Sequence, residues 1–182
     1  MSDQPSVTFD LAHDYLEVAR AATAVSGPPG ERLLGRHGHV GVQNAIFCVN
    51  SMAIIYSYLA VEACVAQVLG GSDRNTESSP SLEERIREAS ELCGQGDLEA
   101  THPELWLRLR VLIRDAATLL LGPPDLEIRQ AGIVELMTRE DPLPYALVAQ
   151  ELVALMYRGS SEARPVWLER NTLVDFKALL VE

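Results

Sequence analysis

The sequence predicts an all-α fold, a helical bundle of about five to seven helices around one long central apolar helix. Apolar residues recur at three- and four-residue steps along most of the chain, which is the period of an amphipathic helix. Residues 42–69 are apolar on nearly all sides and contain no Lys or Arg and one acid, Glu62. Hydrophobic residues make up 47% of the chain and aromatic residues only 5%, so aliphatic side chains must fill the core.

The length of 182 residues favours a single domain, 1–182. The first expected helix covers about residues 8–25 and ends at the Gly- and Pro-rich loop 26–30. Its apolar stripe consists of Leu11, Tyr15, Val18, Ala22 and Val25. The central helix, 42–69, would be about 42 Å long.

That length would permit the central helix to span a membrane. Glu62, together with the polar side chains of Asn50, Ser51 and Gln67, disfavours a membrane span because polar groups are costly to bury in lipid. We therefore expect no membrane contact and a buried core helix, apolar nearly all round.

Three further helices are expected after the polar loop 70–80. One covers about residues 81–93 and begins with a capping-box pattern, Ser81 and Glu84. The next covers about residues 101–121, begins with a second such pattern, Thr101 and Glu104, and ends where a Gly-Pro-Pro sequence follows. The last covers about residues 142–158 and ends at Gly159.

Two stretches near the C-terminus are less regular. Residues 125–139 are compatible with a short helix, but Gly132 weakens that prediction. Residues 160–182 contain enough apolar side chains, including Trp167 and Phe176, for a C-terminal segment that docks on the bundle.

The central helix carries a polar seam. On a helical wheel, four polar residues and one apolar residue fall within about 60° of arc. They are Asn44, Ser51, Ile55, Tyr58 and Glu62. Because an unpaired buried carboxylate costs several kcal/mol, Glu62 needs a partner or a water-filled cleft. The expected partners are Tyr58 and an arginine of the helix over 101–121, namely Arg108, Arg110 or Arg114. The seam is then either the floor of a polar pocket or a structural pair that sets the helix register.

The net charge of −11 does not support nucleic acid, including RNA, as a partner, because proteins that bind the phosphate backbone need a basic surface. Three cysteines argue against a disulfide framework. Residues 1–10 contain neither a basic region nor an apolar run, so no signal peptide is predicted and a cytoplasmic location is expected. No cofactor is expected, since the chain contains no dinucleotide or phosphate loop.

The four histidines give weak signals. His37 and His39 form an H-x-H pair in a loop, but they supply only two ligands and no pattern of Cys, Asp or Glu completes a tetrahedron, so no metal site is predicted. His102 is expected to be exposed at a helix start. His13 is expected to pair with Glu17 one turn later.

Two stretches of the sequence show a likeness to a known family. Residues 53–63 combine a hydrophobic run, Ser and Tyr residues, and then Glu62-Ala63. This run resembles the long helix of HEPN-like (higher eukaryotes and prokaryotes nucleotide-binding) proteins. Residues 105–115 resemble the helix that leads into that family's Arg-Asn-x-x-x-His signature. The likeness covers about residues 11–120 and implies a helical bundle that dimerises through its signature helices.

The resemblance implies two kinds of function. Many HEPN-like proteins are metal-independent ribonucleases of toxin–antitoxin and defence systems, in which the Arg stabilises the phosphate and the His acts in general acid–base catalysis. Others are catalytically inactive and act as binding or regulatory modules. In this chain Arg114 takes the Arg position and Asp115 the Asn position, but the His position falls on Leu119 or on Thr118. Leucine cannot transfer a proton, so the signature is degenerate here.

A second Arg–His spacing occurs before the central helix. Arg32 precedes His37 by five residues and His39 by seven, and both separations fit an Arg-x(4–6)-His pattern. These three residues are the candidates for catalysis if the chain is a ribonuclease.

The sequence thus favours a non-catalytic interaction module, a homodimer or the partner of another protein in a bacterial regulatory or defence system. Any polar cleft would be lined by Asn44, Ser51, Tyr58, Glu62 and Arg114. The alternatives are a metal-independent ribonuclease, with RNA as its substrate, and a helical bundle that binds a small molecule.

Overall fold

The computed structural model describes residues 11–25, 38–70, 80–120 and 141–159, together with Trp167 and Val174; for 38–46 it describes the backbone alone. Every regular element in these residues is a helix, so the predicted all-α class is confirmed. The helices are α1 (Leu11–Val25), α3 (Gly38–Val68), α4 (Leu82–Leu92), α5 (Leu98–Thr101), α6 (Pro103–Leu120) and α8 (Leu143–Gly159). The short helix predicted within 125–139 lies outside the described residues.

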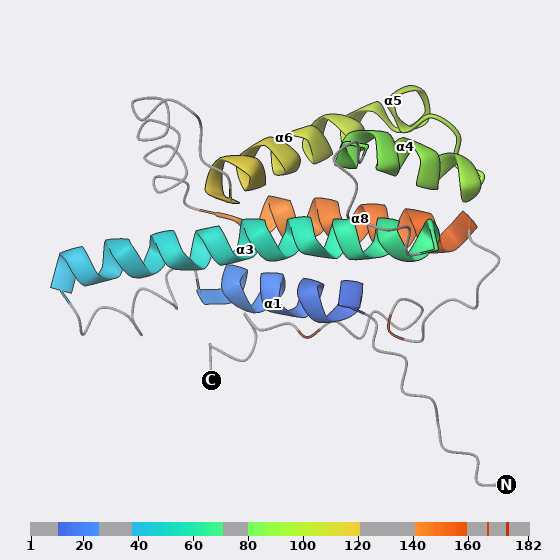
Figure 1. The fold of residues 1–182 in the computed structure, drawn as a ribbon. Coiled ribbons are helices and arrows are strands. Elements are labelled where there is room, and N and C mark those ends of the chain that lie inside the picture. Colours follow the sequence, from blue (N-terminus) through green and yellow to red (C-terminus); the bar gives the residue numbers. More distant parts are fainter. Residues whose placement is uncertain are drawn as a thin grey trace, which may run out of the picture.

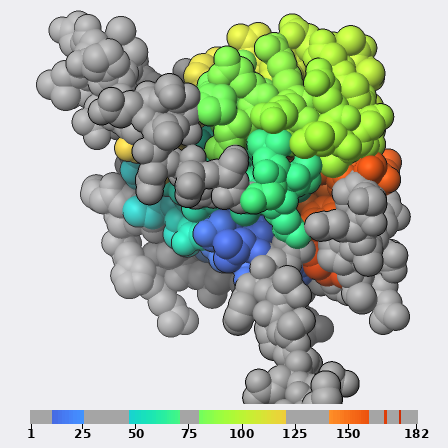
Figure 2. Space-filling model, turned by 45° about the vertical axis from the view of Figure 1, so that its right-hand side comes forward, coloured from blue at the N-terminus to red at the C-terminus, as the bar shows by residue number. Residues whose placement is uncertain are grey.

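Helix α3 is the centre of the bundle. Its 31 residues extend for about 46 Å at 1.5 Å per residue. In Figure 1, α1 lies along one side of α3, while α6 and α4 lie on the other side and α8 runs beside it. Figure 2 shows the C-terminal part of α3 reaching the surface between α4 and α1.

The apolar character of α3 is matched by its packing. Phe47–Val68 is the one stretch of the described residues that is long and apolar enough to cross a membrane. In the bundle this stretch contacts α1, α4, α6 and α8, and Ile54, Val61 and Val65 are fully buried among them. The expectation of burial nearly all round is met only in part, because 44% of the most apolar window of this stretch is buried.

The described helices share one hydrophobic core, which consists mainly of aliphatic side chains as the composition predicts. The largest fully buried side chains come from every long helix. They include Leu16, Ile54, Ile86, Leu109, Leu112, Leu152 and Met156.

One of the two predicted capping boxes is present. The Ser81 hydroxyl accepts a hydrogen bond from the Glu84 N–H at 3.2 Å, and the Glu84 carboxylate accepts one from the Ser81 N–H at 2.7 Å. The predicted box at Thr101 is wrong, because Thr101 ends α5 and its hydroxyl donates to the Asp97 carbonyl oxygen at 2.9 Å. Since Pro103 occupies the first position of α6 and proline disfavours a helical residue before it, the chain breaks there.

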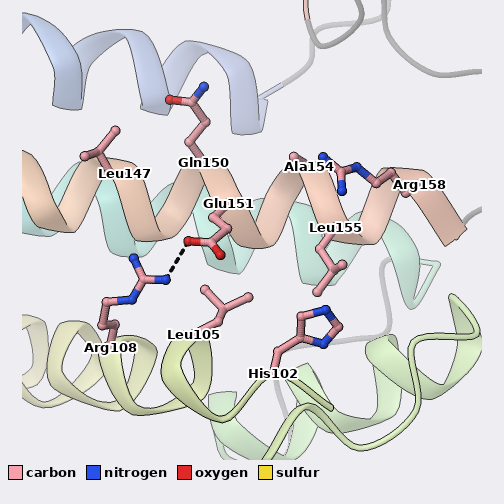
Figure 3. A pocket seen from close by; sticks show the side chains of 9 residues that line it. All are labelled: His102, Leu105, Arg108, Leu147, Gln150, Glu151, Ala154, Leu155 and Arg158. Atoms are coloured by element: carbon pink, nitrogen blue, oxygen red, sulfur yellow. Dashed lines mark hydrogen bonds and ion pairs between the residues drawn. The ribbon is translucent and has the colours of Figure 1, made fainter.

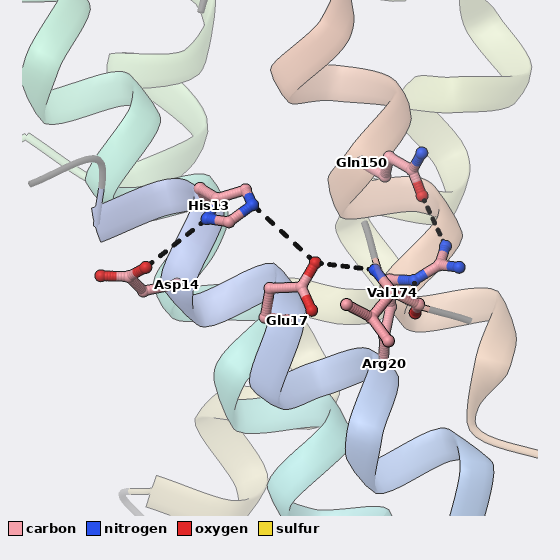
Figure 4. A network of polar contacts seen from close by, with 6 residues as sticks. All are labelled: His13, Asp14, Glu17, Arg20, Gln150 and Val174. Carbon is pink, nitrogen blue, oxygen red and sulfur yellow. Dashed lines mark hydrogen bonds and ion pairs between the residues drawn. The ribbon is translucent and has the colours of Figure 1, made fainter. Parts of the chain in front are cut away.

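Two residues of the predicted docking segment are described, and both lie against the bundle. The Trp167 ring lies 4.9 Å from the His13 ring and 6.3 Å from the Tyr157 ring, centroid to centroid. The Val174 N–H donates to Glu17 at 3.1 Å and its carbonyl oxygen accepts from Arg20 at 3.3 Å (Figure 4). The rest of 160–182 lies outside the described residues.

Candidate functional site

The acid of the central helix has an arginine partner, but not one of the three arginines that the sequence suggested. A carboxylate oxygen of Glu62 lies 3.5 Å from a guanidinium nitrogen of Arg85, and the two side chains are only 20% and 15% exposed. Arg85 belongs to α4, which packs against α3, whereas the expected arginines of α6 have other partners. Arg108 pairs with Glu151, Arg110 with Glu83 and Arg114 with Asp115.

The other residues of the predicted seam are placed as follows. Tyr58 is half-buried and packs against the hydrophobic core. The Ser51 hydroxyl is buried and has no hydrogen-bond partner among the described residues. Asn44 lies within α3, but its side chain is outside the described atoms. Arg114 is 64% exposed and turns towards its neighbour Asp115, so the contacts give Glu62 and Arg114 separate partners.

A buried carboxylate at the interface of α6 and α8 was not anticipated. Asp115 is 6% exposed. One of its oxygens accepts a hydrogen bond from the Tyr145 hydroxyl at 2.6 Å, and the other accepts one from Arg114 at 3.0 Å. The sequence contained a signal for this pair, because Asp115 lies one turn after Leu112 on the apolar stripe of α6.

The degenerate signature can also be placed on α6. Leu119, at the position where the resemblance expects histidine, is partly buried and packs against the core. The Thr118 hydroxyl donates to the Arg114 carbonyl oxygen at 3.0 Å, one turn earlier. Arg32 and His37 lie outside the described residues, and His39 is described only as backbone in the first turn of α3.

An open groove of about 510 Å³ lies between α6 and α8. We call it the α6/α8 groove. Figure 3 shows Leu105, Leu155 and the Arg108–Glu151 ion pair between the two helices, with Leu147 and Gln150 on the side of α8 that faces away from α6. The apolar lining is Leu105, Leu147, Ala154 and Leu155, and the polar lining is His102, Arg108, Gln150, Glu151 and Arg158.

The charges of the α6/α8 groove are accessible. Arg108 and Glu151 form an ion pair at 2.6 Å across the groove, with side chains 47% and 49% exposed. A pair this exposed contributes about 0–1 kcal/mol, so its members can take other partners at little cost. Arg158 is exposed in the last turn of α8 and has no ion pair among the described residues. His102 is half-buried rather than exposed, and its ring lies 2.9 Å from the Thr101 hydroxyl.

A second, smaller pocket of about 350 Å³ lies on another side of α6, between Glu83 of α4 and Leu107 of α6. Cys48 is exposed, and burial raises the pKa of the Cys93 thiol. Within the part of the chain that the structure describes, no three His, Cys, Asp or Glu side chains are grouped as metal ligands.

A comparison of the chain with protein-family models, curated proteins and solved structures finds no match, so the resemblance to HEPN-like proteins stays a prediction.

Proposed function

We propose that this protein is a non-catalytic helical interaction module that forms a homodimer. The regulatory or defence role and the HEPN-like kinship that the sequence suggests are part of the same proposal. The observation that carries it is the α6/α8 groove, because it places apolar side chains beside accessible charged ones on one open surface, as protein-binding surfaces do.

The groove has the composition that such a surface requires. Leu147 remains 45% exposed at its edge, while Leu105 and Leu155 are buried beneath it between the helices. Arginine is enriched at interfaces, because its planar guanidinium group makes several hydrogen bonds while the rest of the side chain packs against neighbouring residues. A groove between two helices is also the surface on which a further helix docks by its apolar side chains.

Two acidic residues of the bundle have structural contacts. Glu62 joins α3 to α4 through Arg85, and Asp115 joins α6 to α8 through Tyr145. Such pairs keep helices in one register. They favour an interaction module over an enzyme built at the predicted seam.

The test is the mass of the protein in solution, measured by sedimentation velocity and by light scattering across a range of concentrations. One chain has a mass of 20.0 kDa, so the expected species is twice that mass. A species that stays at the mass of one chain at the highest soluble concentration contradicts the proposal. Native mass spectrometry of the same sample checks the small-molecule alternative, because a groove of this volume is within the range of ligand sites.

The ribonuclease alternative has its own assay. We expect no cleavage of single-stranded RNA in the absence of metal. Cleavage that is lost in both His37→Ala and His39→Ala variants would replace the proposal with the ribonuclease hypothesis.

A further inference from the structure

The homodimer proposed above has a specific surface. We infer that the outer stripe of α8, which consists of Leu147, Glu151, Ala154 and Arg158, packs antiparallel against the same stripe of a second copy of this chain. Glu151 of each copy then pairs with Arg158 of the other. The inference rests on the proposed function, which it deepens by naming the surface and its geometry.

The four residues form one continuous line on α8. Their separations of four, three and four residues keep them on a single helix face. Nine of the other thirteen residues of α8 are buried in the bundle. Figure 3 shows the four side chains in order along α8, next to the groove that α6 completes. The stripe is therefore the side of α8 that the described part of the bundle leaves accessible.

The stripe is complementary to itself. Glu151 and Arg158 are seven residues apart, which is about 10.5 Å along the helix axis. A two-fold axis that crosses α8 between Ala154 and Leu155 brings Glu151 of one copy opposite Arg158 of the other, and the reciprocal pair follows by symmetry. A parallel arrangement would place like charges opposite each other. The small side chain of Ala154 lies near the axis, where the two helices come closest.

The overall charge of the protein also favours this face. Two copies of a chain with a net charge of −11 repel each other unless they meet where the surface is not acidic. The α6/α8 groove has two arginines, Arg108 and Arg158, and one acid, Glu151. Its formal balance is thus +1 with His102 neutral.

The contact would involve four helices, α6 and α8 of both copies. Leu147, which is 45% exposed, and the half-buried Ala154 supply the apolar area that the charged pairs alone lack. Glu151 would lie between Arg108 of its own copy and Arg158 of the other. The exposed Arg108–Glu151 pair need not break for this to occur.

The test is a charge reversal with rescue. Glu151→Arg places two arginines opposite each other at both symmetric positions, and Arg158→Glu places two glutamates there. We expect each single variant to raise the dimer dissociation constant at least about tenfold, since facing like charges are costly at an interface. The double variant, which exchanges the two charges, should return to within about threefold of the unchanged chain. Sedimentation equilibrium measures all four proteins.

Two control variants make the same charge changes elsewhere. Glu99→Arg alters an exposed ion pair with Arg87, and Arg110→Glu alters one with Glu83 on another side of α6. Neither should change the dissociation constant more than about twofold. Thermal melting of every variant separates weakened association from a damaged fold.

The outcomes distinguish the inference from the proposed function. If the unchanged chain dimerises and the single reversals leave its dissociation constant unaltered, the surface is wrong while the homodimer stands. If both singles weaken the dimer and the double variant does not recover, the antiparallel pairing is wrong. If the unchanged chain is a monomer, both the proposed function and this inference are overturned.

Discussion

The buried pair between Asp115 and Tyr145 permits a quantitative prediction about what holds α6 against α8. Tyr145→Phe removes only the hydroxyl that donates to Asp115 at 2.6 Å, and leaves the ring in place among its neighbours. A hydrogen bond to a charged group contributes about 1.5–3 kcal/mol, because the buried carboxylate loses solvation that this donor helps to replace. In a chain of this length, that loss corresponds to a lower melting temperature by about 3–12 °C.

A second tyrosine provides the matched control. Tyr157 is also buried, and its hydroxyl donates to the neutral Gln67 side chain at 3.0 Å. Tyr157→Phe should therefore cost only about 0.5–1.5 kcal/mol. The free energy of unfolding is measured in urea by circular dichroism, at one protein concentration because dimerisation would itself change stability.

The double variant sharpens the test. Asp115→Leu leaves no buried carboxylate, so adding Tyr145→Phe to it should cost much less than Tyr145→Phe costs alone. The reasoning is refuted if Tyr145→Phe is within about 0.3 kcal/mol of the unchanged chain, or if the two substitutions are additive.

Three further predictions concern the contact of Gly159 with the end of α4, the N-cap of α4, and the reactivity of the cysteines. Gly159→Ala should destabilise the protein by about 1–3 kcal/mol, because a Cβ there would overlap the backbone carbonyl of Cys93, which cannot rotate away. A melting temperature equal to that of the unchanged chain would contradict this prediction. Ser81→Ala should lower the stability at neutral pH by about 1 kcal/mol through loss of the N-cap. Hydrogen bonds from the Ser81 N–H and hydroxyl lower the pKa of Glu84 below its ordinary value, so the contribution of Glu84 to stability is present above that value and is lost as the pH falls through the lowered pKa. Thermal melts at several pH values check this, and the unchanged chain and a Glu84→Gln variant should converge in acid, because both side chains are then neutral. Cys48 should react rapidly with a disulfide reagent in the folded protein, because it is exposed. The buried Cys93 thiol, whose pKa is raised, should react only after unfolding. Equal reaction rates for the two thiols would contradict the burial of Cys93.

The sequence alone predicted the helices because the signals that specify a helix are local. The three- and four-residue apolar period, the Ser81–Glu84 box and the glycines after each segment lie within a few residues of the structure that they specify. One local signal misled, since Thr101 resembled an N-cap but Pro103 was the stronger determinant of where α6 begins. The pairing of His13 with Glu17, which is likewise local, is confirmed at 3.8 Å.

What tertiary structure alone decided is which side chains meet. The sequence showed that Glu62 required a partner, but the identity of Arg85 depends on how α4 crosses α3. The α6/α8 groove was not predicted, because its lining residues on one side are more than 30 residues away in the chain from those on the other. No local pattern relates His102 and Arg108 to Arg158. A burial pattern along one helix shows which face is covered. Only the packing of the helices determines what covers it and what remains open.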